Sequence, residues 1–215
     1  MKKGLKVLVV LLCAVMLVAA SVMGTLAYLT SQDSVKNTFT VGNVTIALDE
    51  YVVNPETGKK TGNELVAADT NGNKGMQNLK LVPGREVEKH PFVTVKGNSE
   101  SCWLFVKVEN GLVDYEASGN TTVAEQLNAK GWVPLAGVAN VYYYKDIVPA
   151  SEDNQTFDVF TSVKIADNAE SVAGWAEIAT KGNIVVTAYA IQSEGFDLKA
   201  NDADNAADAW VALNP

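Results

Sequence analysis

The chain contains 215 residues, of which 17 are basic and 25 acidic, and its formal net charge at pH 7 is −8. This length suits one sizeable domain, or one domain together with a segment that is removed by processing. The acidic balance argues against nucleic acid or an anionic membrane surface as the partner of the mature protein.

The first segment has the layout of a secretory signal. Three lysines lie among the first six residues, and the apolar run Val7 to Ala20 follows them. Small residues come next, where a peptidase needs an extended substrate, so residues 1–27 are predicted to be a signal peptide that is cleaved between Ala27 and Tyr28. The alternative is a retained membrane helix, because the run from Val7 to Leu29 is long enough to span a bilayer. Under the signal interpretation, the chain meets a membrane only before cleavage.

Cysteine usage is sparse. The chain has two cysteines, and Cys13 belongs to the predicted signal peptide. The mature chain then keeps Cys102 alone and forms no intrachain disulfide. Because Cys102 lies in the apolar run SCWLFVKV, a buried core thiol is favoured over a reactive one.

The mature chain consists of strand-like segments of alternating polarity, separated by clusters of Gly, Asn and Asp. Residues 28–40 form a polar N-terminal segment, and the first intramolecular strand is expected from about Val41. Residues 54–78 combine turn-forming residues with almost no apolar ones, which predicts a long exposed loop. Calcium binding is the alternative for its DTNGN part, but no acidic ligand follows at the usual spacing.

The middle of the chain has the densest strand signal. A Pro83-Gly84 turn is expected between two strands, and Cys102 to Asn110 is apolar on both parities, which is typical of a central strand covered on both faces. A short helix is predicted over Thr121 to Lys130, with Thr121 as its cap. Trp132 to Lys145 then fits two strands or a hairpin.

The last third predicts two strands and two helices. The strands are Thr156 to Ile165 and Asn183 to Phe196, and the helices are Ala169 to Ala179 and Ala206 to Leu213. The whole pattern therefore predicts a mainly β protein, an antiparallel β-sandwich over residues 41–215, with two or three short helices in connections and at the C-terminus.

The residues offer little chemistry. His90 is the one histidine, and neither an HExxH motif nor a GxSxG elbow is present. The acidic cluster Asp202, Asp204 and Asp208 could hold a cation, but it begins just before the predicted last helix, where Asp serves as a cap and dipole partner. We therefore predict no catalytic residue, no metal site and no cofactor.

The run GTLAYLTSQDSVKNTFTVGNVTIALDE resembles the N-terminus of the TasA and camelysin group of Gram-positive bacteria, whose precursors are cut by the dedicated signal peptidase SipW. Three later segments are similar as well: LVPGREVEKHPFVTVKGNSESCWLFVKVE, the pair YYYKDIV and TFDVFTSVKI, and VVTAYAIQSEGFD with an AW-containing C-terminal helix. Together they cover most of the mature chain.

The resemblance implies a secreted, jelly-roll-like sandwich that is built into extracellular fibres of a biofilm matrix. In that group, the segment just after the cleavage site leaves its own domain and adds as a strand to the next subunit. By position, residues 28–40 would be this donor strand here. Its apolar anchors would be Tyr28, Leu29, Val35 and Phe39. The implied partners are another copy of the chain, other matrix proteins and, during export, the signal peptidase.

Three alternatives remain open from the sequence. The mature N-terminus could be an unstructured tail. Camelysin-like relatives have been classed as metallopeptidases, although one histidine without a metal motif speaks against that activity here. The third alternative is a monomeric surface or matrix accessory domain that uses loop 54–78 for adhesion.

Overall fold

The computed structural model describes residues 43–68, 81–119, 121–195 and 202–213. Every described residue belongs to one compact unit of the chain. The predicted signal peptide, its cleavage position and segment 28–40 lie outside the described residues and stay predictions. Within the described ranges, no helix has the length and apolar character needed to cross a membrane.

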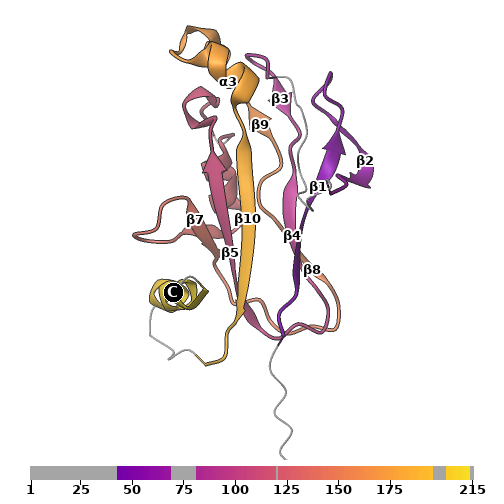
Figure 1. Cartoon of the computed structure of the whole chain (residues 1–215), viewed down its shortest axis with the longest axis vertical. Coiled ribbons are helices and arrows are strands. Elements are labelled where there is room, and N and C mark those ends of the chain that lie inside the picture. The colour runs from indigo at the N-terminus through magenta and orange to yellow at the C-terminus, as the bar shows by residue number, and fades with distance from the viewer. Residues whose placement is uncertain (1–42, 69–80, 120, 196–201, 214–215) are drawn as a thin grey trace, which may run out of the picture. The chain divides into compact units, whose positions relative to one another are not determined.

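The fold is mainly β, with two four-stranded antiparallel sheets and a two-stranded ribbon (Figure 1). The first sheet has the order β2-β1-β4-β8, the second β10-β5-β7-β6, and β3 pairs with β9. Their bounds are β1 Ile46–Val53, β2 Lys60–Leu65, β3 Glu86–Val87, β4 Pro91–Val95, β5 Cys102–Asn110, β6 Trp132–Pro134, β7 Val141–Tyr144, β8 Gln155–Asp158, β9 Val163–Lys164 and β10 Ile184–Gln192. The predicted antiparallel architecture is confirmed, whereas the jelly-roll connectivity stays a prediction.

One apolar core lies between the two large sheets. Val93 and Val95 from β4 meet Leu104 and Val106 from β5 there, and all four side chains are almost completely buried. Side chains alternate across a strand, so the even-numbered residues of β5 enter this core. The two sheets therefore form a sandwich, and β5 is the predicted central strand.

A second apolar cluster covers the outer face of the β5 sheet. Trp103 and Phe105 point away from the first core and are buried under helix α4, Asp202–Leu213. The ring of Trp210 in α4 lies 5.4 Å from the ring of Phe105 and 5.1 Å from that of Tyr189 in β10, measured between centroids. Because α4 begins at Asp202, the predicted start at Ala206 is wrong. Asp204 and Asp208 are exposed helical residues and do not precede the helix.

Helix α2, Val123–Ala129, begins with a capping box. Thr122 is its N-cap: the Thr122 hydroxyl accepts from the Glu125 backbone N–H, and the Glu125 carboxylate accepts from Thr122 N–H. The prediction of Thr121 as the cap is wrong by one residue, because the Thr121 hydroxyl instead donates to the Ala117 carbonyl at 2.7 Å. Gly131 follows the helix with a φ of 89°, a left-handed value that glycine adopts without strain.

Two predicted elements are divided in the structure. Thr156 to Ile165 contains β8 and β9, which pair with different strands, so the single predicted strand is wrong. The predicted helix Ala169 to Ala179 is a short 3-10 turn, η2 (Ala169–Ser171), followed by α3 (Trp175–Lys181). Gly174, with a φ of 87°, separates the two because a left-handed residue interrupts a right-handed helix. A second 3-10 turn, η1, spans Val113–Tyr115.

The predicted long loop 54–78 is also wrong in part. Strand β2 occupies Lys60–Leu65 and pairs with the C-terminal part of β1. Its sequence KTGNEL has almost no apolar residue, so alternation could not reveal it, and backbone pairing with β1 stabilises it instead. The expected exposure is seen from Thr61 to Leu65, while residues 69–78 lie outside the described ranges. By contrast, the predicted β6–β7 hairpin is confirmed by its antiparallel register.

Candidate functional site: the open edge of strand β10

One lateral side of the sandwich is closed. The Trp132 indole N–H donates to the Asp158 carbonyl at 2.8 Å and so ties β6 of one sheet to β8 of the other. The rings of Tyr144 and Phe157 meet edge to face beside it, with centroids 4.8 Å apart. Lys130, just after α2, places its ammonium group 3.0 Å from the Asp158 carboxylate. Aromatic packing and polar contacts therefore seal this side.

A glutamine fixes α2 on the same closed side. The Gln126 carbonyl oxygen accepts from the backbone N–H groups of Thr161 and Ser162, at 3.0 and 3.2 Å. Its amide N–H₂ donates to the carbonyls of Thr121 and Ser162, at 2.9 and 2.8 Å. The amide satisfies the backbone of the β8–β9 connection much as another strand would, and so this connection is not available for strand pairing.

The opposite lateral side is formed by β10 and β1, which lie next to each other. In the second sheet, β10 is hydrogen-bonded to β5 and to no other described strand. Gly111 N–H donates to the Asn183 carbonyl, and Ser193 N–H donates to the Ser101 carbonyl. In an antiparallel pair, residues alternate between exchanging these bonds and pointing their backbone groups away. The odd-numbered residues of β10 therefore bond to β5.

The even-numbered residues of β10 direct their backbone groups outward. These residues are Ile184, Val186, Ala188, Ala190 and Gln192. Within the described ranges, no backbone group bonds to their N–H or carbonyl groups. The first four also place their side chains at the rim of the core, where they remain half-buried. One row of residues thus carries both outward backbone groups and incompletely covered apolar side chains.

Strand β1 contributes a facing rim of the same kind. Val44, Ile46 and Leu48 pack against the core and are also half-buried. Lys96 N–H donates to the Thr45 carbonyl, so the odd-numbered residues face β4 and the backbone groups of Ile46 and Leu48 point away from it. Strand β2 pairs with β1 only further along. We call the outward side of β10 and this rim the open edge.

In the part of the chain that the structure describes, the open edge lacks the usual protection of a sheet edge. Natural edge strands are commonly short, charged, bulged or interrupted by proline. Strand β10 is nine residues long, its sequence IVVTAYAIQ has no charged residue and no proline, and its register with β5 is continuous. Strand β2 shows the contrast, because it is a short, polar edge with a lysine and a glutamate. An unprotected edge of this length is a template for another strand.

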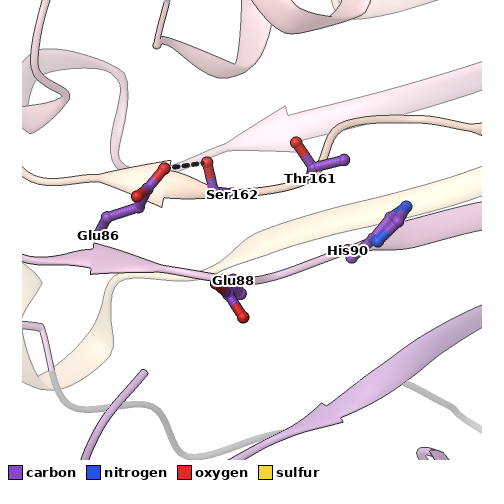
Figure 2. A pocket seen from close by; sticks show the side chains of 5 residues that line it. All are labelled: Glu86, Glu88, His90, Thr161 and Ser162. Atoms are coloured by element: carbon purple, nitrogen blue, oxygen red, sulfur yellow. Dashed lines mark hydrogen bonds between the residues drawn. The ribbon is translucent and has the colours of Figure 1, made fainter. Parts of the chain in front are cut away.

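A second, smaller feature is a polar pocket of about 250 Å³ between the β3–β4 segment and the β8–β9 connection. Figure 2 shows that Glu86 reaches across it to Ser162, whereas Glu88 points away from that pair. Backbone N–H of Lys60, and then the Lys59 ammonium group, lower the pKa of Glu88 by hydrogen bonding to it. The carboxylates of Glu86 and Glu88 therefore point in different directions and do not converge on one ligand position.

His90 borders this pocket and has a structural contact. Its Nε2 lies 2.8 Å from the Asp158 carboxylate, and its ring packs beside Tyr51 and Phe92, with centroids 5.3 and 6.2 Å away. These contacts give the histidine a structural role. No group of three His, Cys, Asp or Glu side chains suited to a metal ion occurs in the described part of the chain.

The candidate residues named from the sequence fall into two sets. Cys102 is buried without a disulfide partner, which confirms the predicted core thiol. The cleavage pair and the four donor anchors at positions 28, 29, 35 and 39 lie outside the described residues. Sequence analysis found the strand at β10 but missed its place at a sheet edge. The available signal was that neither face of IVVTAYAIQ carries a charged residue. This signal indicates that both faces are buried, but it does not show which elements cover them.

Comparisons of the chain with family models, curated proteins and solved structures found no match.

Proposed function

We propose that this chain is a secreted structural subunit that assembles head to tail, with residues 28–40 of one copy adding as a strand to the open edge of the next. The supporting observation is β10 itself, a nine-residue apolar edge strand whose outward backbone groups meet no described strand. Strand addition to a sheet edge satisfies such groups and lets alternate side chains enter apolar positions. The product is an extracellular fibre in which other matrix proteins are further partners.

The length of the donor segment suits this edge. Nine residues of β10 span about 30 Å at roughly 3.3 Å per residue. Residues 28–40 outnumber them, and five residues separate their end from β1, which begins at Ile46. Cleavage after Ala27 would free this segment at its N-terminal end, and so export would precede assembly.

Hydrogen bonds alone do not hold such a contact. Five outward residues offer up to ten backbone groups, and each new bond contributes about 1 kcal/mol net. Ordering the backbone of a donor strand costs about 1–2 kcal/mol per residue, and association costs several kcal/mol more. Burial of apolar side chains must therefore supply the balance, which gives the donor anchors and the half-buried rim their importance.

The first test compares two purified chains, one starting at Tyr28 and one starting at Val41. We expect filaments in electron micrographs and fast sedimentation only for the longer chain. Equal assembly of both chains would contradict donation by residues 28–40. Persistent monomers of the longer chain that bind glycans or another matrix protein would instead support the accessory-domain alternative.

The second test closes the acceptor in the chain starting at Tyr28. Val186→Pro removes one outward N–H, which β5 does not use, so the domain should fold, while the edge can no longer pair there. Val186→Ala is the matched control, since it shortens the side chain and keeps the N–H. We expect Val186→Pro to remain monomeric and to shorten wild-type filaments when added in small amounts, because it still donates. Normal filaments from Val186→Pro would overturn the assignment of β10 as acceptor.

A further inference from the structure

Side-chain size changes abruptly along the open edge. The four inward-facing residues of β10 begin with the branched Ile184 and Val186 and continue with Ala188 and Ala190. Ala188 pairs with Val106 and Ala190 with Leu104, and both β5 residues are fully buried. On their β5 side the alanines therefore adjoin fully buried residues, while the two alanines are themselves half-buried. Beyond them, the edge carries less side-chain volume than anywhere else on its apolar part.

The facing rim beside the two alanines is apolar as well. Ile46 and Leu48 of β1, and Val44 just before it, belong to the same core cluster as the alanines and are likewise incompletely covered. A side chain placed beside the alanines would thus meet hydrocarbon from both sheets. Polar donor residues would lose water there without gaining a hydrogen bond, which is unfavourable.

The donor segment offers few bulky apolar side chains. In an extended strand, residues of one parity share a face. Leu29, Val35 and Phe39 are all odd-numbered and would face the core together, whereas Tyr28 would face outward. Phe39 is the largest of the three. An aromatic side chain reaches both the residue directly opposite and its diagonal neighbour two positions along, which matches the spacing of two successive alanines.

Resting on the proposed function, we propose that Ala188 and Ala190 form the seat for Phe39 of the neighbouring copy, so that this size match fixes the register of the added strand. A strand shifted by two residues would place the ring against the branched Val186 in one direction or the polar Gln192 in the other. A shift of one residue would turn the ring outward. The two alanines thus determine which segment the open edge accepts.

The seat is tested in the chain starting at Tyr28. Ala190→Leu fills it, and Phe39→Ala empties it; either change should raise the concentration needed for filaments at least about tenfold, given the value of burying one large apolar side chain. Combining the two changes should restore a large part of the assembly. Val185→Leu is the matched control, because Val185 lies on the outer face of β10 and is 43% exposed.

Failure of the seat is distinguishable from failure of donation. If Ala190→Leu and Phe39→Ala both assemble normally while the chain starting at Val41 does not, the seat is wrong and donation stands. If the chain starting at Val41 also assembles, donation itself is wrong. Because Phe39 precedes the folded domain, its substitution remains informative even if Ala190→Leu does not fold.

A covalent measurement locates the contact directly. A chain with Phe39→Cys and Ala190→Cys, assembled above the raised concentration that loss of Phe39 requires and then oxidised, should give a ladder of disulfide-linked copies on a non-reducing gel. The pair Phe39→Cys and Val185→Cys should give none, because position 185 faces the opposite side of the sheet. A ladder from the control pair and none from the first pair would overturn the proposed register.

Discussion

The ammonium group of Lys89 lies 2.7 Å from the carboxylate of Glu50, and only 14% and 5% of these two side chains are exposed. Glu50 lies in β1, and Lys89 lies just before β4. The pair is next to the part of β1 that pairs with β2. Removing one member of a buried ion pair takes away attraction that offsets the desolvation cost of the charge that stays. Lys89→Met should therefore lower the free energy of unfolding by about 3–5 kcal/mol, measured by urea denaturation.

The control for this prediction is an exposed ion pair near by. Lys59 and Glu88 lie 3.1 Å apart, but 55% and 39% of their side chains are exposed. Lys59→Met should cost less than about 1 kcal/mol, because water already solvates both charges. The double variant Glu50→Leu with Lys89→Met should recover much of the loss. Equal effects of Lys89→Met and Lys59→Met would contradict a stabilising role of burial at the first pair.

Asp158 should make the domain less stable as the pH falls into the acidic range. Burial raises its pKa, but hydrogen bonds from His90 and Lys130 outweigh burial and lower the pKa below its usual value. A lowered folded-state pKa gives stability that is present above the unfolded pKa of about 3.9 and is lost as pH falls through the folded value. Asp158→Asn should therefore be less stable than wild type at pH 7, and this difference should shrink below about pH 4.

Glu116 provides the opposite sign in the same experiment. Burial raises its pKa, and hydrogen bonds from Asn110 and the Val123 backbone only partly offset this effect. Its contribution is therefore fully present below the unfolded pKa of about 4.3 and is lost as pH rises through the folded value. Relative to Glu116→Gln, wild type should lose stability as pH rises. For Asp158, a stability difference between wild type and Asp158→Asn that stays constant from pH 7 to pH 3 would refute the lowered pKa.

Local sequence signals predicted the strands and helices of this fold better than they predicted which strands pair with one another. The alternation in β5 and β10 and the glycine after α2 were readable, because they depend on neighbouring residues. Strand β2 was not readable, since its polar residues are ordered only by backbone pairing with β1. The open edge was hidden for the same reason, because a strand sequence shows how apolar its faces are and not which strands lie beside it. The hydrogen bonds of the Gln126 amide to Ser162 likewise join residues that are 36 positions apart.

Cys102 offers a final prediction about how firmly β10 is held. Its side chain is fully buried, burial raises the pKa of its thiol to about 11, and it pairs with Gln192 at the end of β10. Reaction with a thiol reagent requires an exposed thiolate, so the folded chain starting at Tyr28 should remain unlabelled at pH 8. Denaturation should expose one reactive thiol per chain, since no other cysteine follows Ala27. Val185→Cys, at an exposed position of the same strand, should label rapidly without denaturant. Equally fast labelling of Cys102 in the native chain would show that β10 separates readily from β5, and a strand so loosely held could not serve as a fixed acceptor edge.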